Sequence, residues 1–196
     1  MSTRAAHNGR SMPRIFLSYR RNDAAGHAGR IFDRLERAFG SDNVFMDVAG
    51  IGPGENFAEA IDRRISDCEV VLVVMGREWL GQGDAEGGET ARIAHEHDFV
   101  RAEVMAALRL KKVVIPVLVN GAALPSRDML PGDLVELLAL NAIRLHDDGF
   151  REDVTRLIQA IKRTKGKAEV TLLTLQLTTG AAVIFVAVLV LMLLQR

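Results

Sequence analysis

Cysteine and the two large polar aromatic residues are almost absent from this chain of 196 residues, which contains one cysteine, one tryptophan and one tyrosine. The single Cys68 excludes an internal disulfide and favours a reducing compartment. Neither sign of charge is in excess, because 25 Lys and Arg residues balance 25 Asp and Glu residues. We therefore expect no general polyanion partner, and no nucleic acid in particular.

Several nucleotide-binding, signalling and metal motifs are missing as well. A P-loop requires a GK[ST] ending, and none occurs. A dinucleotide-binding fold requires GxGxxG after its first strand, where this chain has SYRRND from Ser18. A phospho-accepting receiver requires an aspartate after its third strand, where Met75 and Gly76 stand. His95 and His97 lack accompanying cysteines or an ordered set of carboxylates, so no metal site is expected.

Short apolar runs alternate with helix-type periodicity, which predicts an α/β fold with a parallel sheet and helices on both faces. Strands are expected at Arg14–Tyr19, Val44–Met46, Glu69–Gly76, Lys112–Asn120 and Asn141–Leu145. Helices are expected at Ala28–Phe39, Phe57–Asp67, Asp98–Leu108 and Phe150–Lys162. The run at Glu69–Gly76 is rich in valine, which is typical of a strand buried on both faces.

Polar residues follow the first two predicted strands. Tyr19, Arg20 and Arg21 stand at the end of the first strand, and Asp47 follows the second. A loop with three glycines and a proline comes next, at Val48–Asn56. Ligands of parallel sheets bind at the carboxyl ends of the strands, so these residues are candidates for a binding site.

An aromatic residue and a carboxylate lie four positions apart in the third predicted helix, at Phe99 and Glu103. This spacing places them on one helix face. The ring could give a base or a ribose an apolar wall, and it would desolvate the acid beside it. The same spacing suits a core phenylalanine and a solvated glutamate, so these residues alone leave their role open.

Five motifs in order resemble those of a bacterial TIR domain over residues 13–163. They are FLSYRRND at Phe16–Asp23, VFMD at Val44–Asp47, VVLVVMGREWL at Val70–Leu80, DFVRAEV at Asp98–Val104 and VVIPVLV at Val113–Val119. The resemblance implies a flavodoxin-like three-layer sandwich with a five-stranded parallel sheet. It also implies self-association through this domain.

The resemblance implies two alternative functions. Domains of this kind either pair with other TIR domains as non-catalytic adaptors, or cleave the nicotinamide–ribose bond of NAD in defence or stress signalling. The enzymatic members carry a catalytic glutamate in a Trp-x-x-x-Glu pattern, which falls here on Phe99 and Glu103. The substrate-binding residues implied by the resemblance are Tyr19, Arg20, Arg21, Asp47 and Phe99. NAD would be the substrate, and no cofactor is expected.

The chemistry of this reaction needs few groups. Nicotinamide leaves ribose as a neutral molecule, so no general acid is required, and one carboxylate can stabilise an oxocarbenium-like transition state. Arg20 and Arg21 could pair with the diphosphate, or could simply end a strand in solvent. Trp79 is expected in the core.

The end of the chain differs from the rest in composition. Residues 164–169 form a short basic linker, and Val170–Leu194 contains no charged residue. That length suits a transmembrane helix across a hydrocarbon core of about 30 Å. Basic residues precede the segment, which predicts a single-pass anchor with the TIR domain in the cytoplasm. A stripe of small and hydroxylated side chains, Thr171, Thr174, Thr178 and Ala181, predicts association through this helix. Residues 1–12 are expected to be a disordered tail.

Overall fold

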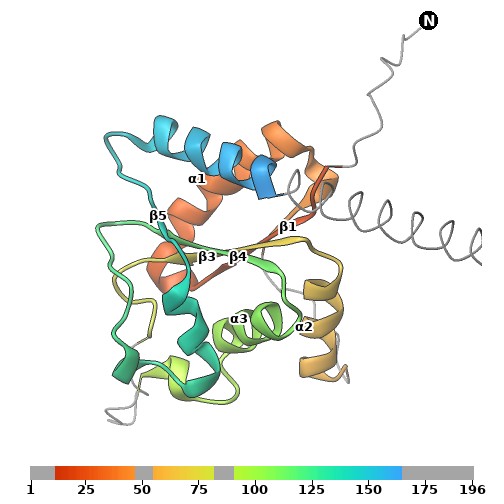
Figure 1. The fold of residues 1–196 in the computed structure, drawn as a ribbon, viewed down its shortest axis with the longest axis vertical. Helices are drawn as coiled ribbons and strands as arrows, with labels where there is room; N and C mark the ends of the chain where they lie inside the picture. The colour runs from red at the N-terminus through yellow and green to blue at the C-terminus, as the bar shows by residue number, and fades with distance from the viewer. Residues whose placement is uncertain (1–11, 47–54, 82–90, 165–196) are drawn as a thin grey trace, which may run out of the picture. The chain divides into compact units, whose positions relative to one another are not determined.

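A parallel sheet of five strands lies at the centre of the molecule (Figure 1). The computed structural model describes residues 12–46, 55–81 and 91–164. The strands are β1 (Ile15–Tyr19), β2 (Val44–Met46), β3 (Val70–Met75), β4 (Val113–Leu118) and β5 (Ile143–Arg144). Their spatial order is β2-β1-β3-β4-β5, and every neighbouring pair is parallel. The order reverses between β1 and β3, and such a switch point opens a crevice at the carboxyl ends of the strands.

Helices cover both faces of the sheet. Figure 1 shows α1 (Arg21–Phe39) on one face, with α2 (Phe57–Ser66) and α3 (Phe99–Arg109) side by side on the other. Residues 150–164 are also helical, and the compact unit that holds the sheet extends to Ile158. Short 3-10 turns complete it: η1 (Ser41–Asn43), η2 (Arg92–Ala94), η3 (Arg127–Met129) and η4 (Gly132–Ala139). The predicted α/β fold with a five-stranded parallel sheet is confirmed.

Strand β3 shows why its residue pattern predicted its position in the sheet. All six residues of β3 are buried, since the strand pairs with β1 on one side and β4 on the other and helices cover both faces. Valine packs well on such a pleated surface, and a continuous apolar run is therefore the expected pattern. The other strands lie within two residues of the predicted bounds.

Helix α1 begins at Arg21, seven residues before the predicted start at Ala28. Its first turn is polar, so hydrophobic periodicity did not reveal it. The turn is held instead by Asp23, whose carboxylate accepts hydrogen bonds from the backbone N–H groups of Gly76 (2.8 Å) and Glu78 (2.9 Å). A carboxylate in the first turn also complements the helix dipole. A tertiary contact with the end of β3 thus sets the start of the helix.

The eight-residue 3-10 helix η4 was not predicted. Leu134 and Leu137 are fully buried in it and lie three residues apart. A 3-10 helix has three residues per turn, so this spacing places both leucines on one face. The same spacing also occurs on one face of an α-helix, so it does not by itself identify a 3-10 helix.

Several predictions concern residues outside the described ranges. The tail, apart from Met12, lies there, as do Asp47, the loop as far as Gly54, and residues 165–196. Among the residues that the structure describes, no helix combines the length and the apolar character needed to cross a membrane. The span predicted at Val170–Leu194 remains a prediction.

The close approach of Asp23 to Gly76 leads to a test of the fold. A Cβ atom added at Gly76 would lie 2.3 Å from Asp23 Oδ1. We expect Gly76→Ala to displace the carboxylate and to lower the free energy of unfolding of the full chain by about 1–3 kcal/mol. Denaturant titration measures this. Gly26→Ala is the matched control, because that site in α1 has no neighbouring atom within 4 Å. The control should stabilise the chain by about 0.5–1 kcal/mol. A Gly76→Ala protein as stable as the parent would refute the contact.

Candidate active site

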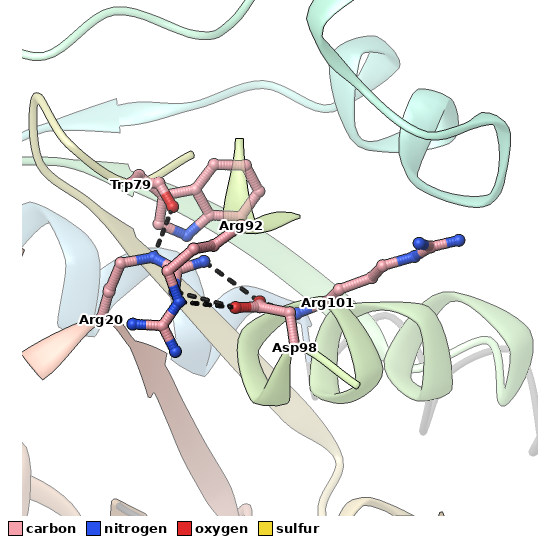
Figure 2. Close-up of polar contacts among 5 residues, drawn as sticks. All are labelled: Arg20, Trp79, Arg92, Asp98 and Arg101. Atoms are coloured by element: carbon pink, nitrogen blue, oxygen red, sulfur yellow. Dashed lines mark hydrogen bonds and ion pairs between the residues drawn. The ribbon is translucent and has the colours of Figure 1, made fainter. Parts of the chain in front are cut away.

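A buried ion pair joins three distant segments of the chain (Figure 2). Arg20 follows β1 and is only 4% exposed. Its Nη1 donates to Asp98 Oδ2 at 2.9 Å and its Nη2 donates to Asp98 Oδ1 at 3.0 Å. Its Nε donates to the carbonyl oxygen of Trp79 at 2.8 Å. The pair therefore fixes the end of β1 to the segment after β3 and to the start of α3.

Asp98 has a second role as the N-cap of α3. Its backbone is extended, and its Oδ1 accepts a hydrogen bond from the backbone N–H of Arg101 at 3.0 Å. A carboxylate at this position satisfies an otherwise unpaired N–H group and complements the positive end of the helix dipole. The same side chain thus starts the helix and sets its position relative to β1.

The first turns of α3 and the end of β1 enclose a cavity of about 480 Å³. This volume is within the range of about 300–1,000 Å³ that is typical of small-molecule sites. It lies at the carboxyl end of β1, where the strand order reverses. The cavity is lined by Leu17, Tyr19, Arg20, Arg21, Asn22, Arg92, Asp98, Phe99, Val100 and Glu103.

Phe99 and Glu103 both line this cavity, as their helical spacing suggested. Glu103 is 6% exposed, so it is not a solvated surface glutamate. Phe99 is 50% exposed, so it is not a core residue either. The arrangement offers an acid largely shielded from water next to an accessible aromatic ring, which can contact a flat or cyclic ligand.

The structure brings five of the six predicted site residues to one cavity: Tyr19, Arg20, Arg21, Phe99 and Glu103. The sixth, Asp47, lies outside the described residues. Their roles remain predictions. Trp79 is 2% exposed and belongs to the hydrophobic core, as expected.

Sequence reasoning missed Asp98 and Arg92 as cavity residues. An aspartate directly before a helix is a recognisable N-cap signal, so that part of the role of Asp98 was accessible. Its pairing with Arg20, 78 residues earlier in the chain, has no local signal. Arg92 stands in a polar stretch without periodicity, and only the fold brings it to the cavity.

The described part of the chain offers little support for a metal site or for a nucleophilic cysteine. Within residues 12–46, 55–81 and 91–164, no group of three or more His, Cys, Asp or Glu side chains could hold a metal ion. Cys68 is buried beside a different cavity, and burial raises the pKa of its thiol to about 11. A thiol with that pKa is protonated at neutral pH and is a poor nucleophile.

Comparison with known proteins agrees with this architecture. The sequence profile described as "TIR domain" matches residues 15–158. No curated protein sequence matches the chain. Among solved structures, the TIR domains of the activated Roq1 resistosome, which directly recognises the pathogen effector XopQ, are 14% identical with a TM-score of 0.51. The match covers 78% of this chain and 98% of that chain. At this identity the likeness supports the fold alone.

A second solved structure is more distant. The CMP N-glycosidase BcmB of Clostridium botulinum is 14% identical, and the match covers 74% of this chain and 96% of that chain. Its TM-score of 0.42 is too low to support an argument.

The buried ion pair leads to a test by a double-mutant cycle. Asp98→Asn keeps an N-cap oxygen but leaves a buried guanidinium without its counter-charge, so we expect a loss of about 3–5 kcal/mol in the free energy of unfolding. Arg20→Met should cost a similar amount. The double variant should cost about as much as one single variant, because the first change already removes the interaction.

The half-exposed ion pair between Arg109 and Asp62 supplies the control for this cycle. Asp62→Asn should cost less than about 1 kcal/mol, because solvent screens the pair. Strictly additive losses at Arg20 and Asp98 would show that the pair does not couple the two segments.

Proposed function

Because the chain belongs to the TIR domain family, we propose that it cleaves the nicotinamide–ribose bond of NAD, with Glu103 as the catalytic carboxylate. The observation that supports this most directly is the pairing of a buried Glu103 with a half-exposed Phe99 on one cavity wall. An adaptor that only pairs with other domains has no need of a shielded carboxylate in a cavity. The resemblance of DFVRAEV to the enzymatic motif supports the same assignment.

The proposed reaction breaks one bond and uses water as the second reactant. The bond between ribose C1′ and the nicotinamide nitrogen breaks, and its electron pair neutralises the cationic ring. Positive charge then develops on the ribose, where the carboxylate of Glu103 stabilises it. Water adds to C1′ and releases one proton. A charge interaction inside a shielded cavity is stronger than the same interaction in water.

The neighbours of Glu103 have supporting roles in this proposal. Phe99 forms an apolar wall for the nicotinamide or the ribose, although it lacks the indole N–H of the tryptophan in the motif. Tyr19, at the end of β1, and Arg21, at the start of α1, contact the substrate. Arg20 donates three of its five N–H groups to Asp98 and Trp79, so its main role is to hold these parts of the cavity wall in position.

We further propose that residues 170–194 anchor the protein in the cell membrane, with the TIR domain in the cytoplasm. The support is the uncharged sequence Val170–Leu194 and the basic residues before it. Confinement to a membrane raises the effective concentration of the domains, so weak contacts between them, including contacts of the Thr171–Ala181 stripe, can produce assembly.

The catalytic assignment is tested by Glu103→Gln. This change keeps the shape of the side chain and removes the charge that the transition state needs. We expect nicotinamide release from NAD to fall by about 10²–10³ or more, with the unfolding transition retained. Chromatography of the reaction mixture measures free nicotinamide. Glu136→Gln, the same change at an exposed position of η4, should keep the parental rate. An active Glu103→Gln protein would rule out the assignment.

The membrane proposal is tested by protease protection. A tag at the N-terminus should survive when protease is added to intact bacterial spheroplasts, and it should be cleaved once detergent opens them. Fractionation should find the full chain with the membrane, and a variant that ends after residue 164 should leave it. Cleavage of the tag in intact spheroplasts would reverse the proposed orientation.

A further inference from the structure

We propose that Arg92 binds the diphosphate of the substrate, an inference that rests on the proposed function for the identity of the ligand. The sequence suggested Arg20 and Arg21 for this contact. Arg92 comes from the turn η2 before α3 and lines the same cavity as Glu103. Its backbone position, its exposure and the charge around it each support this role.

Arg20 is poorly placed to provide the main phosphate contact. It is 4% exposed, and Asp98 binds its guanidinium through both carboxylate oxygens. A phosphate would have to compete with a desolvated, bidentate partner, and displacement of that partner would leave a buried carboxylate without its counter-charge. The charge of Arg20 is therefore already compensated within the protein.

The backbone of Arg92 is held in place. The next residue, Ile93, is fully buried, and its N–H donates to the carbonyl oxygen of Leu80 at 2.9 Å. Arg92 also packs closely against Gly81, where an added Cβ would lie 2.7 Å from Arg92 Cβ. A side chain on a fixed backbone loses less entropy when it orders on a ligand than one on a mobile loop.

The guanidinium of Arg92 remains accessible at the cavity. Its side chain is 50% exposed, and its Nε makes only a long ion pair with Asp98 Oδ2, at 3.9 Å, which is beyond hydrogen-bond distance (Figure 2). Within the described residues it donates no side-chain hydrogen bond. Two guanidinium groups, those of Arg20 and Arg92, lie near the one carboxylate of Asp98. Arg20 already balances the charge of that carboxylate, so the charge of Arg92 is in excess.

The charges around the cavity fit a ligand with both a cationic and an anionic part. Three arginines line it, at positions 20, 21 and 92, against the two carboxylates of Asp98 and Glu103. In the proposed reaction Glu103 faces the developing ribose cation, and Arg92 offers a planar fork that matches phosphate oxygens. NAD carries its diphosphate on the same ribose that bears the nicotinamide. The two contacts would therefore act on adjacent parts of one molecule.

The test compares two ligands on the full chain in detergent. ADP-ribose carries the diphosphate without a cleavable nicotinamide, and nicotinamide riboside carries the nicotinamide–ribose bond without a diphosphate. We expect Arg92→Gln to weaken ADP-ribose binding by about 10–100-fold in calorimetry and to leave the affinity for nicotinamide riboside unchanged. The difference should shrink at high salt, since the guanidinium is half exposed.

Arg127→Gln is the matched control for loss of one positive charge. Arg127 is exposed in η3 and does not line the cavity, so its variant should bind ADP-ribose within about twofold of the parent. The inference fails if Arg92→Gln binds ADP-ribose as the parent does, if both variants weaken equally, or if the parent does not bind ADP-ribose. A parent that binds ADP-ribose through Arg92 but leaves NAD intact supports this inference and overturns the proposed function.

Discussion

The arrangement of the cavity depends on the ion pair between Arg20 and Asp98. Burial of two charges costs free energy, and that cost is offset only when the geometry is good and the remaining hydrogen-bonding groups are satisfied. Here the guanidinium meets both carboxylate oxygens and one carbonyl, and the carboxylate also caps α3. Because Asp98 is the residue directly before α3, the pair determines where that helix begins relative to the end of β1. Every side chain on the first turns of α3 inherits its position from this contact.

The sheet supplies the rest of the geometry. The strand order reverses between β1 and β3, so the connections from these two strands diverge and leave a crevice at their carboxyl ends. Asp23 binds the segment after β3 from α1, and Arg20 binds the same segment at Trp79. These polar contacts join the end of β1, the first turn of α1, the start of α3 and the segment after β3, whereas the hydrophobic core holds the layers together. On α3 the half-exposed ring of Phe99 and the buried carboxylate of Glu103 lie one turn apart and line the same cavity.

Most of the fold could be predicted from the sequence, because its strands and helices are marked by local patterns. The valine run of β3 and the spacing of Ile31, Leu35 and Phe39 in α1 are periodic signals, and all of these residues are buried. The start of α1 was missed because its first turn is polar. The helix η4 was missed because two leucines three residues apart do not by themselves identify a 3-10 helix. The candidate site was found through Phe99 and Glu103, which share one helix. The partner of Arg20 and the placement of Arg92 depend on contacts between distant residues, which no local pattern contains.

Analysis of the products would show whether this cavity cleaves NAD, as proposed. The purified full chain, at high concentration in detergent, is incubated with NAD, and the mixture is followed over time by chromatography and mass spectrometry. We expect one molecule of nicotinamide to appear for each molecule of NAD lost. Intact NAD in the presence of protein that unfolds cooperatively, and is therefore correctly folded, would contradict the proposal.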